Sequence, residues 1–135
     1  MQKPKPHSGL HHVALYIKNL EECVRFYSDL LGMKIIWQPD PDNYYLSSGN
    51  DNFALHRAPA DFNPAKHQRL DHIGIFLTER DEVDIWHQYL HENGVEIKAA
   101  PKDHRDGTRS FYCADPDGNA VQVIYYPINP APIRY

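Results

Sequence analysis

Four polar side chains occupy corresponding places in the two halves of this 135-residue chain. Residues 10–17 read LHHVALYI, and residues 70–77, 60 positions later, read LDHIGIFL. Each stretch places a histidine on an alternating apolar segment, and a second polar residue recurs on the last such segment of each half. The four residues are His12, His56, His72 and Gln122. Imidazole nitrogens and amide oxygens bind divalent metals, so the duplication predicts one metal or ligand site built from two halves.

The segments that carry these residues alternate in the manner of half-buried strands. On the first strand, His12 and Tyr16 share one face. The opposite face carries Val13, Leu15 and Ile17. Apolar faces of this kind pack naturally under helices, which leaves the polar faces to line a concave surface. An unpaired buried polar group costs on the order of 1–3 kcal/mol, and a divalent cation would satisfy all four at once.

Periodicity and turn residues predict the same order of elements in each half, namely one strand, one helix and three strands. We expect strands at residues 10–17, 34–38, 44–47, 53–57, 70–77, 96–99, 109–113 and 120–125. We expect helices at residues 20–31 and about 81–93, the first capped by Asn19 with Glu22 and ended by Gly32. The prediction is an α+β fold in which two βαβββ modules form a cupped, mixed and mostly antiparallel sheet with helices outside.

The predicted organisation is a single domain over residues 10–127. Module one covers 10–57, a linker covers 58–69 and module two covers 70–127. Residues 1–9 are expected to form a flexible N-terminus, and the proline-rich residues 128–135 an extended tail.

Composition excludes several classes of function. A net charge of −4 and a pI near 6.1 give no basic surface for nucleic acid. No apolar run approaches the roughly 20 residues of a membrane span, and residues 1–6 lack the apolar segment of a secretion signal. Two cysteines, Cys23 and Cys113, do not make a disulfide framework. We therefore expect a cytoplasmic protein that acts on a small molecule.

Several motifs resemble those of the vicinal oxygen chelate superfamily, which includes glyoxalase I, fosfomycin-resistance proteins, extradiol dioxygenases and bleomycin-resistance proteins. The resemblance covers residues 10 to about 127 and is most specific in the segments HVAL (12–15), FYSDLLG (26–32), DHI (71–73) and DPDGN (115–119). The family's metal ligands fall on the first and last strand of each module. The resemblance therefore implies that a divalent ion (Fe, Zn, Ni, Co or Mn) is bound by His12, His56, His72 and Gln122.

A narrower resemblance concerns the extradiol dioxygenase signature, whose spacing is matched by His104, Tyr112 and the turn that follows. It implies acid–base roles for Tyr112 and His104. The chain departs from the family at Gln122, where glutamate is usual. A neutral set leaves a bound divalent ion its full charge, which makes it a stronger Lewis acid for an anionic oxygen pair. The same set binds metal less tightly and offers no carboxylate base.

The resemblance implies a metal-dependent enzyme of the glyoxalase or extradiol-dioxygenase type. It would chelate vicinal oxygens of a small substrate and stabilise an enolate- or catecholate-like anion. His56, Tyr16 and Phe76 are the candidate substrate contacts, so His56 has two alternative roles. The competing hypothesis is a metal-free small-molecule binding protein of the bleomycin-resistance kind.

Purely structural interpretations also remain open. Gln122 could bridge strands through its amide, Tyr112 could be a packed tyrosine, and His104 could be a solvated loop histidine. A homodimer is implied by the resemblance, and the modules could pair within one chain or exchange between two.

Overall fold

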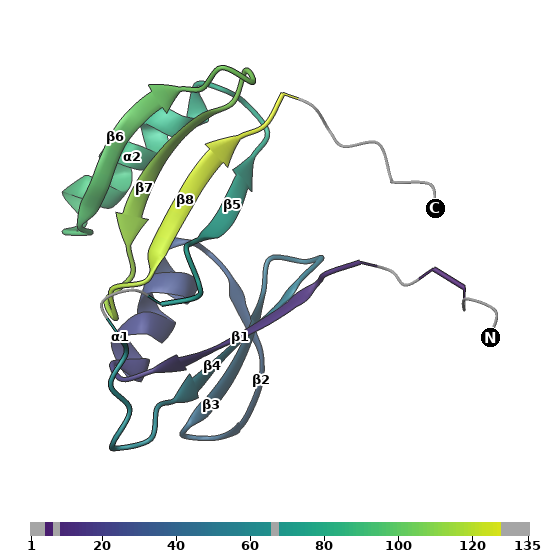
Figure 1. The fold of residues 1–135 in the computed structure, drawn as a ribbon, viewed down its shortest axis with the longest axis vertical. Coiled ribbons are helices and arrows are strands. Elements are labelled where there is room, and N and C mark those ends of the chain that lie inside the picture. The colour runs from purple at the N-terminus through teal and green to yellow at the C-terminus, as the bar shows by residue number, and fades with distance from the viewer. Residues whose placement is uncertain (1–4, 7–8, 66–67, 128–135) are drawn as a thin grey trace.

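The strand–helix–three-strand order occurs twice in the computed structural model, which describes residues 5–6, 9–65 and 68–127 (Figure 1). Module one contains β1 (His12–Ile17), α1 (Leu20–Arg25), the π-helix η1 (Phe26–Leu30), β2 (Lys34–Asp40), β3 (Asn43–Ser47) and β4 (Asn52–Arg57). Module two contains β5 (Ile73–Leu77), α2 (Glu82–Glu92), β6 (Ile97–Asp103), β7 (Arg109–Ala114) and β8 (Ala120–Tyr125). The expected tail at 128–135 and most of the expected N-terminal segment lie outside the described residues.

Each module forms a four-stranded sheet, with strand orders β1-β4-β3-β2 and β5-β8-β7-β6. The pairs β1–β4 and β5–β8 are parallel, and the other pairs are antiparallel. The α+β class and the mixed, mostly antiparallel pairing are therefore confirmed. None of the described helices is long and apolar enough to cross a membrane.

The two sheets are separate in the described chain. No ladder joins a strand of one sheet to a strand of the other within residues 9–65 and 68–127. In Figure 1 the sheet of module two lies above the sheet of module one, with α1 beside the start of β8. Strands β1 and β5 are consequently edge strands. The polar face of module one and that of module two belong to different sheets.

Strands β2 and β6, which form the other edge of each sheet, are longer than expected from the sequence. The expected strands ended at residues 38 and 99, whereas Pro39 and Pro101 lie inside β2 and β6, close to the far end of each strand. Both strands are sheet edges, where a residue without an N–H breaks no ladder hydrogen bond. Register shifts accompany the prolines in both pairings. Strand β5 is shorter than expected, and His72 immediately precedes it.

The first helix is held at its start by module two. Asn19 was expected to cap it, but its side chain forms no cap and instead donates to Glu22 Oε2 at 2.8 Å. The backbone N–H groups of Lys18 and Asn19 donate to the Asp117 carboxylate at 3.2 and 2.9 Å. The helical segment ends at Gly32, as predicted, with a φ of +77°.

A buried hydrogen bond also joins the modules through the core. The Tyr27 hydroxyl on η1 donates to Asp115 Oδ2 at 2.7 Å. Both residues are buried, and burial together with the Asp115 carboxylate raises the pKa of Tyr27. The core around them includes the free, buried Cys23 and Cys113, so no disulfide is present between these two.

Candidate functional site

Strand register pairs two of the predicted histidines with asparagine side chains. His12 lies opposite Asn52, and its Nδ1 donates to Asn52 Oδ1 at 2.7 Å. His56 lies opposite Asn43, and its Nδ1 donates to Asn43 Oδ1 at 2.6 Å. An amide oxygen only accepts, so the ring proton is on Nδ1 and the Nε2 lone pair is left for another partner.

The ring of His72 is also held at Nδ1 by an oxygen acceptor, but the acceptor is its neighbour in sequence rather than a residue on a paired strand. Its Nδ1 lies 2.5 Å from Oδ2 of the preceding Asp71. Metal-binding histidines typically donate their second ring nitrogen to a carboxylate or carbonyl, which fixes the ring and leaves the other nitrogen for the ion. Three of the predicted ligands therefore fit a divalent cation through Nε2.

Gln122 is oriented through its amide nitrogen. It lies on β8, and its Nε2 donates to the buried Ser110 hydroxyl at 3.0 Å. The same hydroxyl lies 2.7 Å from Nε2 of His104. Since the amide nitrogen is occupied, Gln122 has its oxygen Oε1 available as a ligand atom. His104 is half-buried in this hydrogen-bonded chain rather than solvated.

Tyr112 connects the two ligand candidates of module two. It lies opposite Gln122 in the β7–β8 pair. Its ring packs edge-on against His72, with centroids 5.4 Å apart and an interplanar angle of 87°. Module two thus gathers His72, His104, Tyr112 and Gln122 on one face of its sheet.

Module one forms a second group. His56 and Tyr16 line a cavity of about 440 Å³ over the β1–β4 pair. Tyr16 is 58% exposed and Phe76 is 65% exposed, so both aromatic side chains are accessible. Phe76 stacks on Tyr126, with centroids 5.8 Å apart, and lies on β5 of the other module.

Within a single copy of the chain, the described residues do not bring the predicted ligands into one cluster. Among residues 5–6, 9–65 and 68–127 there is no group of three or more histidine, cysteine, aspartate or glutamate side chains placed to hold a metal ion. The physical reason is that His12 and His56 belong to one sheet and His72 and Gln122 to the other. The structure therefore presents two half-sites.

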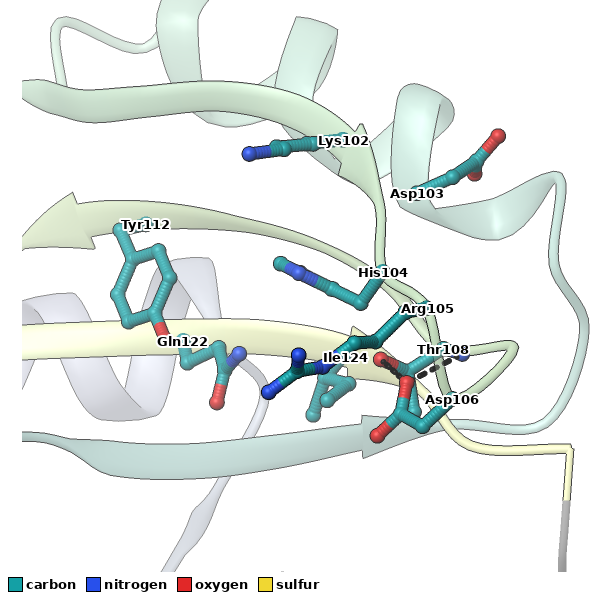
Figure 2. Close-up of a pocket in the computed structure, with 9 residues that line it drawn as sticks. All are labelled: Lys102, Asp103, His104, Arg105, Asp106, Thr108, Tyr112, Gln122 and Ile124. Atoms are coloured by element: carbon teal, nitrogen blue, oxygen red, sulfur yellow. Dashed lines mark hydrogen bonds between the residues drawn. The ribbon is translucent and has the colours of Figure 1, made fainter.

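A larger cavity, of about 610 Å³, adjoins the module-two group (Figure 2). Tyr112, Gln122 and His104 line it together with Lys102 and Arg105 from the end of β6 and the loop that follows. In Figure 2 the hydroxyl of Tyr112 lies toward Gln122, and the Arg105 side chain extends from the loop toward the same residue.

Acidic residues around this cavity are already engaged. Arg109 hydrogen-bonds to Asp84 and Asp103 and lowers the pKa of both carboxyl groups. Hydrogen bonds from Thr108 lower the pKa of Asp106. These carboxylates are therefore ionised at neutral pH.

Several functional partners were missed at the sequence level. Asn43, Asn52 and Ser110 were not singled out, because only strand register shows which histidine or amide each one contacts. Ser110 could have been found from alternation, since it shares a face with Tyr112. Asp71 could have been found from its position next to His72, as the acceptor of its ring proton.

Known proteins resemble this chain over most of its length. The family model described as Glyoxalase/Bleomycin resistance protein/Dioxygenase superfamily matches residues 9–123. A metallothiol transferase FosB of Staphylococcus saprophyticus is 27% identical over 121 residues, covering 85% of this chain and 75% of the relative. A trivalent organoarsenical cleaving enzyme of a Bacillus species is 30% identical over 121 residues, covering 84% and 71%.

Solved structures agree with the fold. A lactoylglutathione lyase from Agrobacterium tumefaciens superposes with a TM-score of 0.73 at 22% identity, covering 90% of this chain and 96% of the other. A glyoxalase-related enzyme from Fulvimarina pelagi gives a TM-score of 0.73 at 18% identity, covering 90% and 91%.

Proposed function

Because this chain belongs to the Glyoxalase/Bleomycin resistance protein/Dioxygenase superfamily, we propose that it is a metal-dependent enzyme acting on a small molecule. His12, His72 and Gln122 are the proposed ligands of a divalent ion, and His56 is either a fourth ligand or a substrate contact. The names of both similar relatives describe enzymes, which supports a catalytic role.

The observation that carries this proposal is the shared orientation of the three histidines. Each has Nδ1 held by an oxygen acceptor and Nε2 left over. In Gln122 the amide nitrogen is held by Ser110 and the oxygen is left over. Metal-binding histidines almost always have the second ring nitrogen held in this way, which fixes the tautomer and the orientation of the ring.

We further propose that the complete site forms in a homodimer, between module one of one chain and module two of another. The half-sites lie on separate sheets, and β1 and β5 are edges whose backbone groups are available for pairing. Exposed aromatic side chains on those strands, Tyr16 and Phe76, provide apolar area for a second copy of the chain to cover.

The chemistry follows from the ligand set. When bound, a divalent ion would act as a Lewis acid toward a vicinal oxygen pair of the substrate. Because the set is neutral, proton transfer falls to groups beside it. Tyr112 lies across from Gln122 and is the proposed proton carrier. His104 is held by Ser110 and is the proposed second group.

Metal analysis of protein purified without chelator tests the proposal. We expect stoichiometric divalent metal in the wild type and at least a tenfold lower affinity in His12→Ala and in His72→Ala, since each removes one of few ligands. His91→Ala is the matched control, because His91 is an exposed histidine on α2 outside the site. If no metal can be loaded with better than micromolar affinity, or if His91→Ala lowers binding equally, the proposal fails in favour of a metal-free binding protein.

A further inference from the structure

Two cations that line the larger cavity form no ion pair with any carboxylate among the described residues. Lys102 and Arg105 both line it, and both are exposed. In the part of the chain that the structure describes, ion pairs involve Arg57, Arg80, Lys98 and Arg109, but neither of these two. Arginine and lysine that face a cavity without a counter-ion are candidates for binding an anion.

The nearby carboxylates do not take this role. Asp103 is held by Arg80 and Arg109. Asp106 uses Oδ1 to accept hydrogen bonds from the Thr108 N–H and hydroxyl groups at 3.0 and 2.7 Å. Both carboxylates therefore have other partners, and Lys102 at the end of β6 and Arg105 in the loop that follows form no ion pair with either of them.

The loop that carries Arg105 is fixed by its own backbone. His104 N–H donates to Thr108 O at 2.9 Å, and Gly107 N–H donates to His104 O at 3.0 Å. Gly107 has a φ of +88°, a backbone conformation that residues with a side chain rarely adopt. A Cβ added to Gly107 would lie 3.3 Å from Cγ of Pro127. Arg105 thus projects from a hydrogen-bonded turn rather than from a free loop.

We propose that Lys102 and Arg105 bind an oxyanion group of the substrate, a carboxylate or a phosphate, in this cavity. The proposal rests on the proposed function, because Tyr112 and Gln122 line the same cavity and would face the reacting part of the same molecule. A cavity of about 610 Å³ is within the range of small-ligand pockets, roughly 300–1,000 Å³. The substrate class is therefore a small organic anion.

Arg105 is the residue expected to discriminate between anions. A guanidinium offers two parallel N–H groups to one oxyanion, whereas the Lys102 ammonium acts as a point charge. Arg105→Gln should therefore weaken binding more than Lys102→Gln, and Arg105→Lys should fall between the wild type and Arg105→Gln.

The test is an NMR titration of chelator-treated, full-length protein with inorganic phosphate and, separately, with acetate at constant ionic strength. The reporters are the Gln122 side-chain amide and the Thr108 backbone amide. We expect saturable shifts at both, and about a tenfold loss of affinity in Arg105→Gln, the scale of one charge-assisted hydrogen bond. A preference for phosphate or for acetate identifies the kind of oxyanion.

Lys98→Gln is the matched control, because Lys98 is also on β6 but is paired with Glu96 outside the cavity. Equal losses in Lys98→Gln and Arg105→Gln, equal binding of neutral acetamide, or no saturable shift at either reporter would each overturn the proposal. Since the protein is free of metal in this experiment, its outcome is independent of whether His12 and His72 bind an ion.

Discussion

Gln122 stands where the resemblance to the vicinal oxygen chelate superfamily implies glutamate, and its side chain makes a hydrogen bond that a carboxylate could not donate. An amide nitrogen donates to the Ser110 hydroxyl, whereas a glutamate could only accept from that hydroxyl. The amide thus orients one oxygen without adding charge. Glutamate at the same place would add a negative charge to three neutral imidazoles.

Replacing Gln122 by glutamate should therefore strengthen metal binding. We expect Gln122→Glu to raise the affinity for a divalent ion by about tenfold or more, because opposite charges attract strongly at ligand distance. Isothermal titration with Zn²⁺ or Mn²⁺ measures the change. Gln88→Glu makes the same charge change on α2, away from the site, and should leave affinity unaltered. Equal affinities in Gln122→Glu and wild type would show that Gln122 lies outside the ligand set.

At this scale the sequence predicted which residues would be candidates but not what would hold them. The histidines follow from the repeat and from strand alternation. Their acceptors, Asn43 and Asn52, depend on which residue lies opposite which, and that is set by β-pairing register rather than by local pattern.

Among the elements, α2, β6 and β7 are joined by one side chain. Arg109 on β7 donates to both oxygens of Asp84 on α2, at 2.9 and 2.8 Å, and to Asp103 at the end of β6. Arg80 also contacts Asp103 from the segment before α2. These ion pairs hold the outer edge of module two beside the cavity.

Acid should weaken this connection. The folded-state pKa of Asp84 and of Asp103 is lowered by Arg109, so the pairs contribute stability above the unfolded pKa of about 3.9. That stability is lost as pH falls through the lower folded-state values. We expect urea unfolding between pH 5 and pH 2 to show a smaller acid-dependent loss in Arg109→Met than in wild type.

Lys98→Met serves as the control for removing a cation from the same sheet, and it should retain the wild-type pH profile. If Arg109→Met also kept the wild-type profile, the pairs of Arg109 would contribute nothing to stability.

Element order, the helix stop at Gly32 and the strand faces could all be predicted, because each depends on residues close together in sequence. The lengths of β2 and β6 could not, because the tolerance for Pro39 and Pro101 depends on these strands being sheet edges. The contact of Asp117 with the start of the first helix could not be predicted either, because Asp117 and Asn19 lie almost a hundred residues apart in the sequence.

For the whole molecule, the separation of the two sheets leads to a distinctive expectation for mixed dimers. Neither His12→Ala nor His72→Ala should form a complete site by itself. In a dimer that contains one chain of each, one of the two sites combines an intact module one with an intact module two, and the other lacks both histidines.

We therefore expect a refolded equimolar mixture of the two variants to regain high-affinity metal binding, at one site per mixed dimer. Metal analysis of the dimer fraction from size-exclusion chromatography measures it. A protein whose sites form within single chains would recover no tight binding on mixing, and a monomer at all concentrations would also contradict the proposal.

The arrangement of the two modules could not be predicted from the sequence either. Repetition indicates that two equivalent halves exist, but an inter-sheet contact leaves no periodic signal in either half. The contacts that position the modules are single residues in turns and helices, such as Asp115 and Tyr27.

Those contacts also mean that the two halves of the duplication are no longer interchangeable. Asp115 and Asp117 of the β7–β8 turn reach across to the first helix. The corresponding turn between β3 and β4 instead folds on itself, with Asp51 accepting hydrogen bonds from Ser47 and Ser48. A chain assembled from two copies of module one would lack the hydrogen bonds that Asp115 and Asp117 accept from Tyr27 and from the backbone at the start of the first helix. The two halves therefore differ at the contact that joins them, although they keep the same order of strands.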